Sequence, residues 1–265
     1  MFGKYQKMIA TKNVQKLAAV VGTIALLSTT GCKNQANTST AQPSTGSSAI
    51  AQPENSSSNP NFQNVTLIDG LENPWGIDWL PNGDMLITER PGQVRLVQNG
   101  TLTSNPIPGV PNIFTENQGG LLDIALHPQF AENRLVYFTY SDGTSSANQT
   151  HIARATYDGN SLTNWDVIFE VSQAKQSGQH FGSRLTWLPD GTLLASIGDG
   201  GNPPLELNGE FIRQQAQNIG SHLGKVIRIN DDGSIPVDNP FANNSEAEPE
   251  VWSYGHRNIQ GLTFD

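Results

Sequence analysis

The chain has 265 residues, with 24 acidic against 15 basic side chains and a formal net charge of −9. Binding the phosphates of a nucleic acid requires clustered lysine and arginine, so this balance argues against a nucleic-acid partner. The 26 glycines and 16 prolines favour turns and short strands over long helices, and we expect an all-β fold.

The first 32 residues have the layout of an export signal. Four lysines among the first 16 residues precede the apolar run 17–27, and small residues then lead to Gly31 and Cys32. A basic segment, a short apolar segment and small residues are typical of a secretory signal. The apolar run is too short for a comfortable membrane span.

Cys32 is the only cysteine in the chain and directly follows the small residues. This placement resembles a bacterial lipoprotein signal, in which Cys32 becomes the lipidated first residue. Thr29 stands where that pattern prefers leucine, so ordinary secretion is the alternative. We predict that residues 1–32 are a lipoprotein-type signal peptide. The exported protein would be anchored to the membrane through Cys32, facing the periplasm or the cell exterior.

Residues 33–61 are rich in Ser, Thr, Gln and Pro and contain hardly any large apolar side chain. Such a segment cannot bury enough apolar surface to fold. We therefore predict a disordered linker between the membrane and a folded domain of residues 62–265.

A repeat begins within this domain. Residues 76–89 and 184–197 each contain a short strand ending in Trp-Leu-Pro, an Asn-Gly or Asp-Gly turn, and an apolar return strand. Residues 123–140 are a looser copy with a longer turn, and residues 261–265 begin a fourth. The spacing between copies is typical of four-stranded propeller blades with insertions of growing length.

Further strands are expected between the copies, at residues 92–98, 151–157 and 224–230, where apolar and polar residues alternate before a turn. One short, Gln-rich helical window covers residues 206–219. The pattern accounts for about three and a half blades. An unclosed propeller leaves sheet edges exposed, so we expect this sequence to be the N-terminal part of a longer protein.

Six ordered motifs carry a resemblance to a known family. They begin at Glu72, Gln118, His180, Gly224, Asp238 and Tyr254. Together they resemble the soluble pyrroloquinoline-quinone (PQQ)-dependent sugar dehydrogenases, the glucose/sorbosone and aldose sugar dehydrogenase group. The resemblance covers about residues 62–265. It implies a six-bladed β-propeller of four-stranded antiparallel blades, in agreement with the repeat.

The resemblance also implies a reaction and its catalytic groups. His180, which opens the segment His-Phe-Gly-Ser-Arg-Leu, would be the general base. It would take the proton of the anomeric hydroxyl while a hydride leaves C1 of an aldose for C5 of PQQ, giving the lactone. An imidazole titrates near neutrality and suits this task. Arg257, with Asn258 beside it, would place a cation next to the quinone, which gains negative charge.

Other positions match the family with less specificity. Gln118 corresponds to a residue that hydrogen-bonds the sugar or the cofactor. Lys225 and Arg184 are candidates either for cofactor contact or for the scaffold. The family also uses Ca²⁺, and its ligands are expected beyond Asp265.

Two positions depart from the family pattern. Ile259 replaces a usual proline, which should loosen that turn. Gln179 stands where some members carry aspartate, which puts in doubt the orientation of His180 by a carboxylate.

Several conspicuous residues have structural interpretations. Aromatic residues at repeat positions are expected to pack within blades, namely Trp75, Trp79 and Trp187. His127 and His222 are predicted to be turn or surface histidines. His256 would point to the opposite strand face from Arg257.

Two acidic segments are not expected to bind a metal. Residues 199–202 lack the ligand pattern of an EF-hand calcium loop, and residues 246–250 are predicted to be a solvated insertion.

Two functions follow from these observations. The first is an exported quinoprotein that oxidises aldoses and passes electrons to an acceptor that the sequence does not identify. The second is a non-catalytic propeller that binds carbohydrate or protein at the cell surface. The combination of His180, Gln118, Arg257 and Asn258 favours the enzyme, because a scaffold needs neither a base nor a cation at those points. Without the remaining blades and metal ligands, residues 1–265 alone are expected to have little activity.

Overall fold

The computed structural model describes residues 64–265. The predicted signal peptide, Cys32 and the predicted linker lie outside the described residues. Within the described part, no helix is both long enough and apolar enough to cross a membrane.

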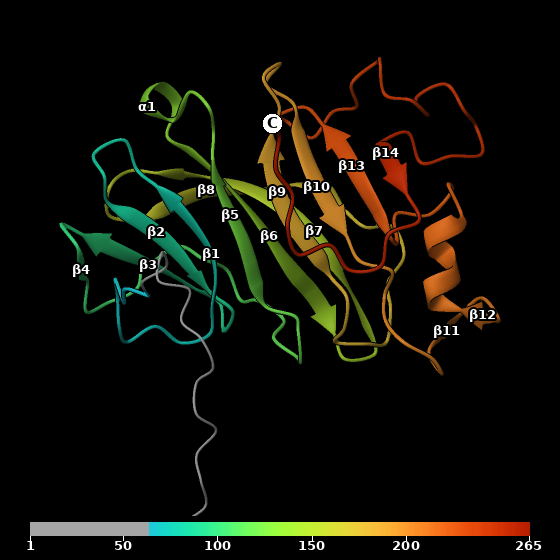
Figure 1. Cartoon of the computed structure of the whole chain (residues 1–265), viewed down its shortest axis with the longest axis horizontal. Helices are drawn as coiled ribbons and strands as arrows, with labels where there is room; N and C mark the ends of the chain where they lie inside the picture. The colour runs from blue at the N-terminus through green and yellow to red at the C-terminus, as the bar shows by residue number, and fades with distance from the viewer. Residues whose placement is uncertain (1–63) are drawn as a thin grey trace, which may run out of the picture. The chain divides into compact units, whose positions relative to one another are not determined.

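Three four-stranded antiparallel sheets follow one another along the chain (Figure 1). The first contains β1 (Pro74–Trp79), β2 (Met85–Glu89), β3 (Gln93–Gln98) and β4 (Thr101–Leu102). The second contains β5 (Leu121–Leu126), β6 (Leu135–Thr144), β7 (Ala147–Tyr157) and β8 (Leu162–Glu170). The third contains β9 (Gly182–Trp187), β10 (Leu193–Ile197), β13 (Lys225–Ile229) and β14 (Val251–Tyr254). Each sheet is one propeller blade, and the expected all-β fold of four-stranded blades is confirmed.

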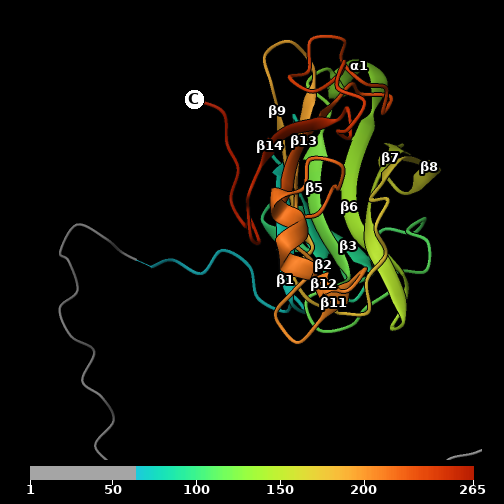
Figure 2. The ribbon, with the colours of Figure 1, turned by 90° about the vertical axis from the view of Figure 1, so that its right-hand side faces the viewer.

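Helical structure is a minor part of the described chain. It consists of α1 (Phe130–Asn133) and the 3₁₀ helix η1 (Ile212–Gln217). The predicted helical window 206–219 is mostly not helical, because its first part forms the hairpin β11 (Glu206–Leu207) and β12 (Glu210–Phe211). Figure 2 shows this hairpin and η1 beside the third sheet. Ile212, Gln215 and Ala216 are the buried residues of η1.

The predicted repeats are confirmed as the hairpins β1–β2, β5–β6 and β9–β10. In each hairpin the first strand has an irregular register, with two residues opposite one residue of the second strand. In the three hairpins, the opposing residues are Thr88, Thr139 and Ser196, and each carries a fully buried hydroxyl.

These hydroxyls join each blade to the next. Each accepts a main-chain N–H at 2.9 Å from its own blade, from Gly76, Asp123 and Arg184 respectively. Each donates to a main-chain carbonyl of the following segment, namely that of Leu122, Ser183 and Ile259. The hydroxyl therefore satisfies two buried main-chain groups at every blade junction.

The same contact defines the start of the fourth copy. Ile259 accepts the third hydroxyl bond, so Gln260 takes the position held by Gly76, Asp123 and Arg184 in the other copies. This contact agrees with a fourth copy that starts near Gly261. Residues 261–265 are not assigned as a strand, although the carbonyl of Leu262 accepts a bond from Thr186 of β9.

The apolar core has two parts, one on each face of the second sheet. Val136 and Phe138 of β6 pack toward the first sheet, while Tyr137 between them packs toward the third. This alternation is the ordinary two-residue period of a strand that is buried on both faces.

Trp187 of the third sheet packs edge-on against Tyr137 of the second sheet at 4.9 Å between ring centroids, so this aromatic packs between two blades. Trp79 is instead 55% exposed, because among the described residues only one face of the first sheet is covered by another sheet.

Candidate active site

His180 lies two residues before β9 and is only 7% exposed. Its φ angle is +49°, a left-handed conformation that is uncommon for residues other than glycine. Its main-chain N–H donates to Oε1 of Gln118 at 2.8 Å, and the N–H of Gln118 donates to the carbonyl of Gly178 at 2.8 Å. Two residues predicted to bind substrate are therefore neighbours, although they come from different blades.

A buried carboxylate orients the imidazole of His180. Nδ1 of His180 lies 2.6 Å from Oδ1 of Asp199, which also accepts the N–H of Gly201 at 3.1 Å. An ionised carboxylate can only accept hydrogen bonds, so in the neutral imidazole Nδ1 carries the proton and Nε2 keeps a free lone pair. The structure thus corrects the doubt raised by Gln179, since the carboxylate comes from a later position in the chain.

The hairpin register contains the signal that could have identified Asp199. Gly182 of β9 pairs with Ile197, the last residue of β10. The residues that follow β10 therefore lie opposite residues 180–181, which precede β9. A Cβ atom on Gly198 would lie 1.9 Å from the carbonyl oxygen of His180. Glycine at this position permits the close approach that places Asp199 beside the imidazole.

Arg257 and Asn258 are brought to the same place. The carbonyl of Arg257 accepts the N–H of Asp199 at 2.7 Å, and Oδ1 of Asn258 accepts the N–H of Gly182 at 3.0 Å. The guanidinium of Arg257 is exposed and donates to Oδ1 of Asn202 at 2.6 Å. It has further N–H donors for an anionic ligand.

Lys225 has a different environment from the other candidates. Its side chain is fully buried, and Nζ donates to the carbonyls of Gln215, Ala216 and Leu223 at 2.7–3.1 Å. Burial lowers the pKa of Lys225 to about 8. Because an ammonium group has only three donors, these bonds favour the scaffold role of the two considered for Lys225.

Arg184 is a clamp between sheets. NH1 donates to Oδ1 of Asp123 at 2.9 Å, and the guanidinium lies 4.5 Å from the ring centroid of Trp75. Burial raises the pKa of Asp123 to about 6, although the N–H of Leu185 and the charge of Arg184 oppose the shift. Trp75 therefore contacts a cation from the third blade and does not only pack within its own.

A pocket of about 430 Å³ includes in its lining Gln118, which bonds the main chain of His180, and Phe181, the next residue in the chain. Its lining includes the polar and aromatic side chains of Asn73, Trp75, Arg90, Gln118, Asn258 and Gln260, together with Phe181. Amide and guanidinium groups around aromatic rings suit a flat ligand that carries carboxylates, or a sugar.

Lys175, a buried lysine near this pocket, is not predicted from the sequence. Nζ of Lys175 lies 3.5 Å from the ring centroid of Phe181 and donates to Oδ1 of Asn148 at 3.1 Å. Burial lowers the pKa of Lys175 to about 7. No periodic pattern marks Lys175, because it lies in the irregular segment between β8 and β9.

The remaining histidines lie elsewhere. His127 packs against Trp187, and Nε2 of His256 bonds Oγ of Ser253 at 2.7 Å. His222 was predicted to be at a turn or surface but is 4% exposed. It is buried because Glu248 and Glu250, predicted to be solvated, turn inward toward its ring.

The sequence matches the model of the glucose/sorbosone dehydrogenase family over residues 71–265. The chain belongs to this family. An uncharacterized protein of Synechocystis, slr1608, is 61% identical over 90% of the chain, and the Escherichia coli aldose sugar dehydrogenase YliI is 36% identical over 78%. The chain spans 60% and 54% of the lengths of these two relatives.

A solved family structure has the same fold. The PQQ-bound aldose sugar dehydrogenase of Streptomyces coelicolor superposes with a TM-score of 0.62 and is 32% identical, covering 76% of this chain and 56% of that one. The predicted membership of the PQQ-dependent sugar dehydrogenase family is thereby confirmed.

Proposed function

We propose that the protein is an exported quinoprotein that oxidises the C1 hydroxyl of aldose sugars to the lactone. The proposal depends above all on one observation, the buried pair of His180 and Asp199, which leaves Nε2 of the imidazole as a base. Family membership gives the reaction class, and the relatives described as aldose sugar dehydrogenases supply the substrate class.

The residues of the pocket fit PQQ, which is flat and carries carboxylates. Within the lining, Arg90 supplies positive charge and Asn258 and Gln118 supply amide groups. Arg257, next to Asn258 in the chain, would add a second cation from outside the lining. When bound, the quinone would supply the hydride acceptor. Arg257 would balance the negative charge that develops on it.

His180 would take the proton of the sugar hydroxyl at Nε2. The imidazolium that forms is stabilised by Asp199, 2.6 Å from the other ring nitrogen. Burial of both side chains keeps water from screening this pair. Gln118, which fixes the main chain of His180, is the residue placed to hold the sugar next to the base.

Calcium, export and lipid attachment are further parts of the proposal. The Ca²⁺ ligands are expected beyond Asp265. The lysine-rich start and Cys32 support a lipid anchor that faces the periplasm or the cell exterior.

The test is dye reduction by the full-length protein, supplied with PQQ and Ca²⁺, over a panel of aldoses. Turnover that requires both PQQ and an aldose supports the proposal. A protein that binds sugar without such turnover would be the non-catalytic scaffold.

A further inference from the structure

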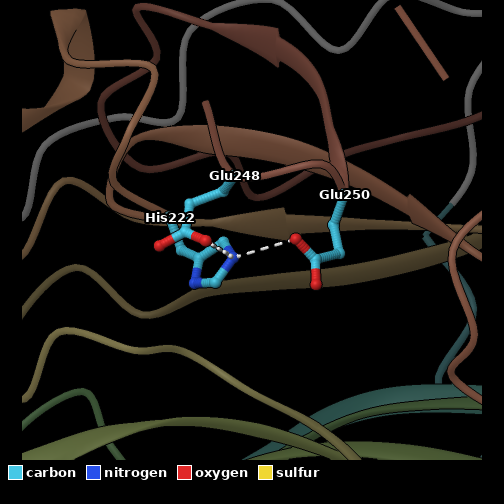
Figure 3. Close-up of side chains that lie close together, drawn as sticks. All are labelled: His222, Glu248 and Glu250. Carbon is cyan, nitrogen blue, oxygen red and sulfur yellow. Dashed lines mark hydrogen bonds and ion pairs between the residues drawn. The ribbon is translucent and has the colours of Figure 1, made fainter. Parts of the chain in front are cut away.

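A histidine and two glutamates meet at the junction of the second and third sheets, outside the pocket described above. Glu250 immediately precedes β14 and Glu248 lies two residues earlier, while His222 lies three residues before β13. Figure 3 shows both carboxylates directed at the same ring nitrogen, Nε2 of His222. Among residues 64–265 this is the one group of three side chains close enough to hold a metal ion.

The distances within this cluster suit a small divalent ion. Nε2 of His222 lies 3.4 Å from Oε2 of Glu250 and 3.8 Å from Oε2 of Glu248, and the three ligand atoms lie within 4.8 Å of one another. In a tetrahedral zinc site with bonds of about 2.0–2.2 Å, neighbouring ligand atoms are about 3.4 Å apart. Little movement is needed to close the three ligands around such an ion.

Ser172, which follows β8 of the second sheet, supports the arrangement. Its hydroxyl donates to Oε1 of Glu248 at 3.0 Å and lies 3.0 Å from Nδ1 of His222. The hydroxyl can therefore accept an Nδ1 proton while it donates to the carboxylate, which leaves Nε2 free to ligate. In a metal-bound histidine, the N–H group of the other ring nitrogen ordinarily donates a hydrogen bond in this way.

Without a metal, a proton on Nε2 of His222 can take the place of the ion. The main-chain N–H of Ser172 lies 3.1 Å from Nδ1 of His222. When Nδ1 accepts that bond, Nε2 must carry a proton, which it donates to Glu250. A proton and a metal ion are therefore alternative cations at one point between two carboxylates.

We propose that His222, Glu248 and Glu250 bind a first-row divalent metal ion of the zinc type, with water completing the coordination. An imidazole with two carboxylates is a typical donor set for such an ion. Ca²⁺ prefers six to eight oxygen ligands, so this site is distinct from the calcium of the family. Ser172 follows the second sheet and the three ligands lie in segments that precede strands of the third sheet. Metal binding would therefore fix the hydrogen-bonded contact between two blades.

The test is calorimetric titration of Zn²⁺ into full-length protein freed of metal by a chelator. Absorption spectra of the Co²⁺ form would report nitrogen and oxygen coordination. We expect one site of micromolar affinity or tighter per chain, with no competition from an equal concentration of Ca²⁺. Glu248→Gln and His222→Gln should abolish binding, and Ser172→Ala should weaken it about 10- to 100-fold.

Glu246→Gln is the matched control. Glu246 is exposed, lies in the same loop and carries the same charge, so this variant should bind as the wild type does. Thermal unfolding without metal checks that each variant is folded. The proposal is overturned if wild-type protein does not bind Zn²⁺ at micromolar concentration, or if Glu248→Gln binds it as tightly as Glu246→Gln does. Neither result depends on dehydrogenase activity.

Discussion

Replacing Asp199 by asparagine tests how the structure makes His180 a base. The variant keeps the size of the side chain and an oxygen that can accept the N–H of Gly201, but it removes the negative charge 2.6 Å from Nδ1. A hydrogen bond between charged groups contributes about 1.5–3 kcal/mol. Each 1.36 kcal/mol in a barrier is about tenfold in rate, so kcat should fall about 10- to 100-fold.

The assay is steady-state dye reduction with PQQ, Ca²⁺ and an aldose in saturating amounts. Asp199 bonds the imidazole at Nδ1, not at the nitrogen proposed to meet substrate, so KM should change much less than kcat. Combining Asp199→Asn with His180→Gln should slow the reaction no further than His180→Gln alone, because Asp199 acts through the imidazole. A kcat for Asp199→Asn within about twofold of wild type would refute the reasoning.

Three other perturbations follow from the described contacts and the sequence. Thr139→Val leaves two buried main-chain groups unpaired between the second and third sheets and should cost about 2–5 kcal/mol in urea unfolding, whereas Thr101→Val at an exposed strand position should change little. Equal effects of the two substitutions would remove the proposed role of the hydroxyl bridge. Lys175 has a pKa of about 7 when folded and about 10.5 when unfolded, so the unfolded chain binds the extra proton between these values and the free energy of unfolding rises with pH in that window. Lys175→Met should flatten this rise in urea titrations from pH 7 to pH 10, and an unchanged slope would contradict the assignment. Cys32→Ser should move the protein from the membrane fraction to the soluble exported fraction. If mass spectrometry finds no lipid on the wild-type protein, lipidation is contradicted and ordinary secretion is the better interpretation.

The repeat could be predicted because local signals determine it. In the first and third copies, Gly83 and Gly191 adopt the positive φ angles that their turns require, and the apolar runs on either side pair as expected. The same locality explains why the residues around His180 were found, since each family motif is a continuous segment. The fourth copy is predicted near Gly261, but its exact register depends on contacts such as the bond from Ser196 to Ile259, which the sequence does not display.

The parts that could not be predicted depend on contacts between distant segments. Asp199 contacts His180 only through the register of a hairpin. Lys225 is buried because its ammonium group donates hydrogen bonds to three carbonyls of η1 and the loop after it. Glu248 resembled a solvated residue because a run of acidic residues ordinarily faces water. Only the fold brings it to His222.

The central claim is that His180 is the general base of a PQQ-dependent aldose oxidation. The most direct measurement compares wild-type full-length protein with His180→Gln, recording PQQ binding by titration and aldose-dependent dye reduction side by side. The account predicts equal PQQ affinity and a loss of at least about 100-fold in turnover for the variant. Equal turnover by the two proteins, or wild-type protein that binds PQQ and reduces no dye with any aldose, would contradict it.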